Sequence, residues 1–145
     1  MRIKIKQFLS VSEVEYVAHR LAREHMMSDK PIPNSGTRFP SVLERCLGSF
    51  NQTFGGKELY PSLADKAAML FYVMIKNHPF QNGNKRIAVA TLLYFLYKNN
   101  RWMDLENSSL YKVAKLVAES SPEVREGVMV SLRSVLKKHS KVLSK

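Results

Sequence analysis

The sequence is short of cysteine and has no long apolar run. Cys46 is its only cysteine, so no internal disulfide can form and a reducing cytoplasm is the expected setting. Charged residues interrupt the stretch 1–15, which excludes the apolar core of a secretory signal. The longest apolar stretches, 67–75 and 87–97, are too short to span a bilayer. We therefore expect a soluble, cytoplasmic protein without a membrane partner.

Acidic residues are scarce relative to basic ones. Lys and Arg together number 23 and Asp and Glu 12, which gives a formal net charge of +11. Such a surface attracts anions, whether nucleotides, nucleic acid or an acidic protein. Part of the excess lies at the two ends of the chain, in 2–6 and 133–145, where charge often serves only solvation. Composition therefore leaves the class of anion open.

Glycine and proline are also few, six of each, so the positions where they gather mark breaks between elements. Helical spacing of apolar residues predicts helices over 12–27, 41–50, 63–75, 87–96, 109–119 and from 122 toward 138. The breaker-rich stretch 28–39 is predicted to be a loop, and Gly55-Gly56 the turn of a short hairpin. Alternation at Ile3 and Ile5 allows a short N-terminal strand. The chain is predicted to be an all-α single domain over 1–145, since 45% hydrophobic residues can fill one core.

Two predicted helices have sequence signals for their first turn. Ser10 with Glu13, or Ser12 with Glu15, can cap the first helix. Ser62 with Asp65 can cap the helix over 63–75, which is apolar on nearly every side. We expect this helix to be central and buried.

Cys46 lies within a repeating apolar pattern. Val42, Leu43, Leu47 and Phe50 surround it at helical spacing. A cysteine in such a stripe is typically a small core residue. We expect Cys46 to be buried and to have no nucleophilic role.

The most informative segment reads HPFQNGNKR, residues 78–86, and lies between two predicted buried helices. Backbone N–H groups at a helix start lack internal partners and attract anions, so the second half of this segment can form a phosphate cradle. Gly83 allows a close backbone approach, while Lys85 and Arg86 supply a mobile charge and a planar fork for phosphoryl oxygens. His78 is of the residue type that exchanges protons near neutral pH and can accept one from an attacking hydroxyl. The pattern predicts a base that faces a phosphate site.

Residues 78–86 resemble the signature of the Fic/Doc family, in which His, Phe, Asn and a basic residue recur at these spacings. Asn84-Lys85-Arg86 stands where AMP-transferring Fic proteins usually have Asn-Gly-Arg, and it is similar to the death-on-curing (Doc) toxin branch. Val89 replaces a further arginine of the AMP-transferring proteins, which also favours that branch. The stretch 52–61 resembles the flap of the same branch. The resemblance covers about 36–102.

The resemblance implies a role for each matching residue. His78 would be the catalytic base, and Phe80 an apolar anchor of the loop. Asn84 would position either the phosphate or the loop itself, while Gly83, Lys85 and Arg86 would bind nucleotide phosphates. Phe54, Gly55 and Gly56 would form a flap that aligns a target segment by backbone pairing.

The resemblance also implies an activity and partners. In the death-on-curing branch the terminal phosphate of ATP is transferred to a threonine of elongation factor Tu, until an antitoxin neutralises the toxin. ATP would thus be the co-substrate and Mg²⁺ its companion ion, held at Asn82, where the family usually has Asp or Glu. An amide is the weaker magnesium ligand, so reduced activity is expected.

Two alternatives stay open at this point. Transfer of AMP would use the same loop but attack a different phosphorus atom of ATP. A degenerate Fic/Doc domain could instead act as a basic binding module, since fold alone does not establish activity. Nucleic acid is not expected to be the main partner, because the informative residues gather near His78 rather than over one basic face.

Overall fold

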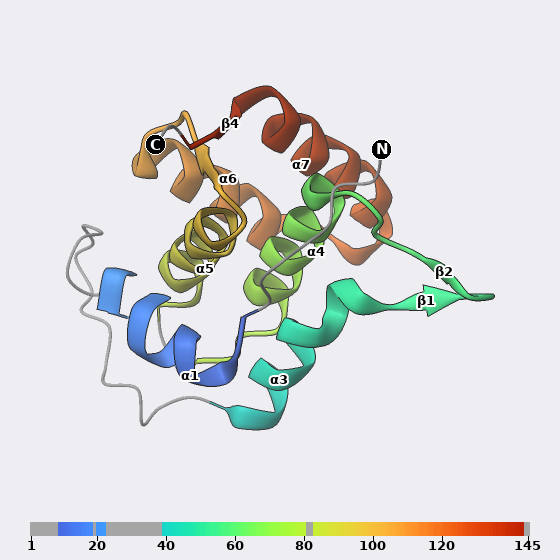
Figure 1. The fold of residues 1–145 in the computed structure, drawn as a ribbon, viewed down its shortest axis with the longest axis horizontal. Coiled ribbons are helices and arrows are strands. Elements are labelled where there is room, and N and C mark those ends of the chain that lie inside the picture. The colour runs from blue at the N-terminus through green and yellow to red at the C-terminus, as the bar shows by residue number, and fades with distance from the viewer. Residues whose placement is uncertain (1–8, 19, 23–38, 81–82, 144–145) are drawn as a thin grey trace.

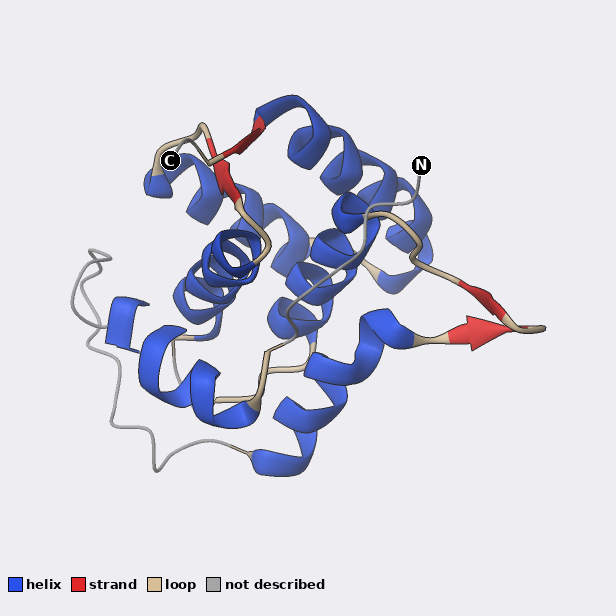
Figure 2. Cartoon of the chain, viewed as in Figure 1, coloured by secondary structure: helices blue, strands red, loops and turns tan. Residues whose placement is uncertain are grey.

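The computed structural model describes residues 9–18, 20–22, 39–80 and 83–143, and within them the chain is an assembly of packed helices (Figure 1). The all-α prediction is confirmed, since the strands among these described residues form only two small ribbons (Figure 2). The predicted N-terminal strand at Ile3 and Ile5 and nearly all of the predicted loop 28–39 lie outside the described residues. The helical elements are α1 Val11–Glu13, η1 Val14–Ala18, α3 Pro40–Gly48, η3 Ser49–Asn51, α4 Leu63–Lys76, α5 Asn84–Lys98, α6 Asn107–Glu119, η4 Pro122–Val124 and α7 Arg125–His139.

Helix α4 is central, as its apolar circumference predicted. The Ser62 side chain accepts a hydrogen bond from the Asp65 backbone and the Asp65 side chain accepts one from the Ser62 backbone, a capping box that fixes where the helix begins. Its buried residues run almost without interruption from Leu63 to Ile75. Helix α5 packs beside it, and α3, α6 and α7 surround this pair (Figure 1). The core is therefore built on two consecutive helices joined by the His78 loop.

The N-terminal helix begins at the first of the two predicted capping boxes, formed by Ser10 and Glu13. It then departs from the regular helix that was predicted, because Val14–Ala18 forms a π-helical turn. Glu13 also binds α5: its carboxylate accepts hydrogen bonds from Lys98 and from the Tyr94 hydroxyl. Burial would raise the pKa of Glu13, but these bonds outweigh it, and the pKa lies below its ordinary value.

Cys46 is buried in the core, as predicted, with 1% of its surface exposed. Burial raises the pKa of its thiol, against weaker opposing effects of Asn77 and Arg45. A thiol held in its neutral form is a poor nucleophile, which supports the prediction of a packing role.

None of the helices that the structure describes has the length and apolar character needed to cross a membrane.

A C-terminal ribbon was not predicted. Strand β3, Arg101–Met103, pairs antiparallel with β4, Ser140–Val142, where the sequence suggested only a solvated basic tail. The pairing closes the chain over the end of α5, and Trp102 packs edge-on against Tyr97 with ring centroids 6.4 Å apart. The strand signal was missed because three residues are too few for a period of two to stand out.

Candidate functional site

The loop between α4 and α5 has a strained residue at its start. Helix α4 ends at Lys76 with Asn77 as its C-cap, and His78 takes a left-handed backbone conformation with φ of 49°. The side chain of His78 is exposed, whereas Pro79 is buried. Left-handed geometry at a residue other than glycine costs on the order of 1 kcal/mol or more and gathers at functional sites. The predicted helix break at His78 is confirmed, and the histidine is accessible to a ligand.

Phe80 and Asn84 close the loop on itself. The Phe80 backbone N–H donates to Asn84 Oδ1 at 2.9 Å, and Asn84 Nδ2 donates to the Phe80 carbonyl at 2.7 Å. The Phe80 side chain is 1% exposed, so it anchors the loop in the core as expected. Asn84 was expected to position either the phosphate or the loop, and in the structure its side chain holds the loop.

Gly83 forms the start of α5. Its φ is 75°, a conformation that glycine adopts without steric cost, and its carbonyl accepts the first helical hydrogen bond from Ile87 at 2.9 Å. The backbone N–H groups of the first turn, which follows Gly83, have no helical acceptors. This 15-residue helix therefore presents its positive end to the loop that carries His78.

The two basic residues of this turn differ in burial. Lys85 is half-buried, whereas Arg86 is only 6% exposed. Burial lowers the pKa of Arg86, an effect that interaction with Tyr111 of α6 partly opposes. Lys85 is thus the more accessible of the two cations, and Arg86 contributes a desolvated charge beneath the turn.

The loop is also held from outside. The Phe39 backbone N–H, just before α3, donates to the Pro79 carbonyl at 2.7 Å.

The predicted magnesium ligand, Asn82, lies outside the described residues. Among the described residues no three His, Cys, Asp or Glu side chains gather into a group that could hold a metal ion. We therefore assign no residue of the described chain to magnesium.

The predicted flap is a hairpin. Strand β1, Thr53–Phe54, pairs antiparallel with β2, Lys57–Glu58, and the two glycines between them take left-handed φ values of 59° and 79°. The turn predicted at Gly55-Gly56 is confirmed, and both glycines are exposed. The Phe54 side chain is 80% exposed. An apolar ring at the tip of an exposed ribbon is available to a partner segment.

Lys66 holds the root of the flap, a role the sequence reasoning missed. Its side chain, 3% exposed, donates to the Tyr60 carbonyl at 2.6 Å and to Glu58 Oε1 at 3.0 Å. A lysine within the apolar run of α4 was the available signal. Because a buried ammonium is costly without such partners, Lys66 ties the hairpin to the core.

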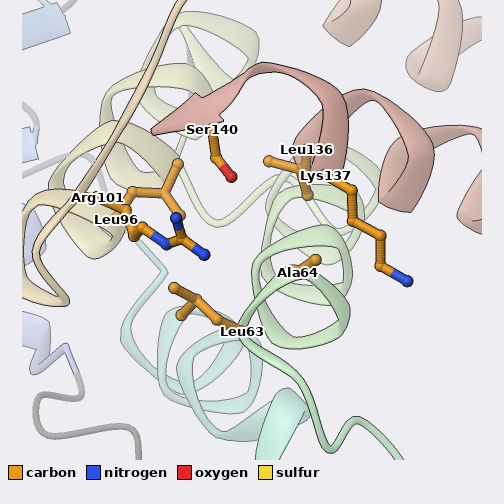
Figure 3. A pocket seen from close by; sticks show the side chains of 7 residues that line it. All are labelled: Leu63, Ala64, Leu96, Arg101, Leu136, Lys137 and Ser140. Carbon is orange, nitrogen blue, oxygen red and sulfur yellow. The ribbon is translucent and has the colours of Figure 1, made fainter. Parts of the chain in front are cut away.

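A small cavity of about 150 Å³ lies at the other end of α4 from His78 (Figure 3). The Arg101 guanidinium and the Ser140 hydroxyl reach toward it from β3 and β4, and its apolar walls come from Leu63, Leu96 and Leu136. Fourteen residues of α4 separate the two places by about 20 Å at 1.5 Å per residue. The cavity is therefore separate from the candidate site.

Comparison with known proteins agrees with this arrangement. The model of the family described as Fic/DOC matches residues 8–96, a longer N-terminal extent than the resemblance suggested. The chain is 34% identical over 82 residues to Toxin Doc of Mycolicibacterium smegmatis, a match that covers 54% of this chain and 63% of that protein. It thus spans less than two thirds of the relative's length, and no solved structure shows significant similarity to the chain. The family match covers most of the chain and includes the loop and the flap: this protein belongs to the Fic/DOC family.

Proposed function

We propose that this chain is a toxin-like protein kinase, which transfers the terminal phosphate of ATP to a hydroxyl side chain of a protein target. One observation carries the proposal: an exposed histidine in strained geometry shares one short loop with the positive end of a core helix. A base and an anion-binding helix start, fixed relative to each other, are what hydroxyl phosphorylation needs from a protein. Membership of the Fic/DOC family and the similarity to Toxin Doc support it.

In the proposed reaction His78 accepts the proton of the target hydroxyl. The hydroxyl oxygen forms a bond to the γ-phosphorus of ATP, and the bond from that phosphorus to the β,γ-bridging oxygen breaks, so that ADP leaves. The first-turn N–H groups of α5 and the side chain of Lys85 would stabilise charge on the phosphoryl oxygens. Because Arg86 is buried, it would act through the electric field of its charge and by supporting the first turn of α5.

The remaining predicted residues would position these groups. The two hydrogen bonds between Asn84 and Phe80 fix the distance between the start of α5 and the loop backbone at Phe80. The flap would pair its backbone with an extended segment of the target, while Phe54 would cover an apolar residue of that segment. We assign no step to magnesium, which would accompany ATP on its phosphates.

We further propose that the target is a translation factor such as elongation factor Tu and that a cognate antitoxin controls the chain in the cytoplasm. The similarity to a protein named Toxin Doc supports a protein target and a cognate antitoxin. The choice of a translation factor follows only from the resemblance of residues 78–86 to the death-on-curing branch. A formal charge of +11 would also favour association with an acidic partner protein.

The test uses ATP labelled separately at the α and γ phosphates. The purified chain is incubated with each form and with a bacterial lysate or purified elongation factor Tu, with and without magnesium. We expect protein labelling from γ-labelled ATP alone, and none with His78→Ala. Labelling from the α position would establish AMP transfer instead. Absence of label from both forms would refute the enzymatic proposal and favour a binding module.

A further inference from the structure

The cavity beside the C-terminal ribbon has no part in the chemistry proposed for His78, which lies at the other end of α4 (Figure 3). It holds about 150 Å³, a volume that accommodates a molecule about the size of benzene. Elements α4, α5, β3, α7 and β4 contribute the residues that line it. A ligand in this cavity would therefore not compete for the residues that the proposed transfer uses.

The register of the ribbon turns two polar side chains toward the cavity. Met103 of β3 pairs with Ser140 of β4, and Met103 is buried, with 2% of its surface exposed. Because residues two apart on a strand share a face, Arg101 lies on the same inner face as Met103 and Ser140. Trp102 and Lys141 form the outer, exposed face of the ribbon. The Arg101 guanidinium and the Ser140 hydroxyl consequently point into one space (Figure 3).

Arg101 has no counter-ion within the part of the chain that the structure describes. Its guanidinium takes part in none of the ion pairs there, and neither this group nor the Ser140 hydroxyl has a hydrogen-bond partner among those residues. A half-buried guanidinium presents its N–H donors as a planar fork, which matches the two oxygen atoms of a carboxylate. The pair of side chains thus offers donors to an anion that has acceptors.

The charges around the cavity also favour an anion. Of the residues described in its lining, Arg101 and Lys137 are charged, and the exposed Lys137 extends away from the cavity (Figure 3). The elements that form the cavity carry two carboxylates. Asp65 is paired with Arg133 at 3.4 Å, and Glu126 lies at the far end of α7 from Lys137. Because the positive end of α4 meets the negative ends of α5 and α7 here, the side chains rather than the helix ends decide the sign.

The walls that surround these donors are apolar. Leu63, Leu96 and Leu136 are 7%, 2% and 3% exposed, and Ala64 completes this lining. An aliphatic chain placed against them would lose apolar surface to water on neither side. A free phosphate would leave the leucines uncovered, whereas a wholly apolar ligand would cover the guanidinium without pairing it. The cavity therefore suits a ligand with an anionic head and a short apolar chain.

We propose that this cavity binds a carboxylate that carries a short aliphatic chain. The carboxylate accepts hydrogen bonds from the Arg101 guanidinium and the Ser140 hydroxyl, and the chain lies against Leu63, Leu96 and Leu136. The volume limits the chain to about four carbon atoms. Two sources supply this chemistry: a free branched-chain acid, and the C-terminal carboxylate of a peptide that ends in leucine.

The first test measures binding of isovalerate to the whole chain by calorimetry. We expect a dissociation constant below about 1 mM, which a ligand of about seven heavy atoms can reach. Isovaleramide, which lacks the charge, and acetate, which lacks the chain, should each bind at least about tenfold more weakly. Binding of the tripeptide Gly-Gly-Leu as tight as that of isovalerate would assign the site to a peptide C-terminus, and weaker binding would assign it to a free acid. No binding of isovalerate at about 10 mM, or equal binding of the amide, would overturn the proposal.

The second test locates the ligand. Arg101→Gln should raise the dissociation constant for isovalerate at least about tenfold, whereas Arg45→Gln, the same change at an exposed position of α3, should leave it unchanged. Ala64→Leu keeps Arg101 but fills the cavity from α4 with a good helix former, so it should also weaken binding at least about tenfold. Circular dichroism checks that the variants keep their helices. Isovalerate should raise the melting temperature of the wild type and of Arg45→Gln alone. Undiminished binding in either Arg101→Gln or Ala64→Leu would refute this site.

Discussion

The His78 loop and the flap hairpin are held in different ways. The loop is fixed at Pro79 and Phe80: the Asn84 side chain binds the Phe80 backbone twice, and the Pro79 carbonyl accepts a hydrogen bond from Phe39. The flap is held at its root, where Lys66 binds Glu58 and Tyr60, and its tip is exposed.

This difference matches the demands of the two proposed roles. Proton and phosphate transfer require atoms held within a fraction of an ångström, which backbone hydrogen bonds to a core helix can provide. Recognition of a target segment by backbone pairing tolerates a more adaptable partner. The contrast predicts that changes in the loop reduce catalysis or stability strongly, and changes at the flap tip only weakly.

The largest effect is expected from His78→Ala. Phosphate transfer should fall by about 10²- to 10⁴-fold, since the variant removes the general base, while the free energy of unfolding should stay within about 1 kcal/mol because the side chain is exposed. Labelling with γ-labelled ATP and urea denaturation measure the two quantities. Full transfer activity in this variant would remove His78 from the proposed reaction.

Asn84→Ala is expected to affect both quantities. It removes both hydrogen bonds between the Asn84 side chain and the Phe80 backbone, which should lower the free energy of unfolding by about 2–4 kcal/mol. Transfer should also fall, because the helix start and His78 are no longer held together. Asn107→Ala, at an exposed position at the start of α6, provides a matched control and should change neither. A stability equal to that of the wild type would show that the two hydrogen bonds between Asn84 and Phe80 are dispensable.

Lys66→Met tests the root of the flap. The variant keeps the apolar stem but leaves the Tyr60 carbonyl and the partly exposed Glu58 without the ammonium, so a loss of about 2 kcal/mol in unfolding free energy is expected. Glu58→Gln, which retains an acceptor, should cost less. Thermal and urea denaturation compare the three proteins. Equal losses for both variants would argue that the carbonyl bond contributes little.

The smallest effect on stability is expected from Phe54→Ala. With 80% of the side chain exposed, the free energy of unfolding should change by no more than about 0.5 kcal/mol. Transfer to the protein target should fall about tenfold, equivalent to about 1.4 kcal/mol of barrier, while ATP binding measured by calorimetry stays unchanged. A variant that phosphorylates its target as well as the wild type does would separate the flap tip from recognition.

The sequence determined the elements that follow from local chemistry. The capping pair Ser62 and Asp65, the apolar circumference of α4 and the break at His78-Pro79 each act within a few residues, so their outcome could be predicted. The turn at Gly55-Gly56 was predictable for the same reason, since left-handed geometry favours glycine. These elements also placed the histidine and the basic helix start at the two ends of one loop.

The tertiary structure decided what depends on residues far apart in the chain. The pairing of β3 with β4, the burial of Arg86 beneath the turn and the binding of Lys66 to the flap root arise from contacts that no local pattern encodes. Asn84 illustrates the division most clearly: its position was marked by the sequence, but only the folded loop shows that its amide binds the Phe80 backbone. Local propensity fixes where helices begin and end, whereas packing decides which polar groups are buried and which partners they then need.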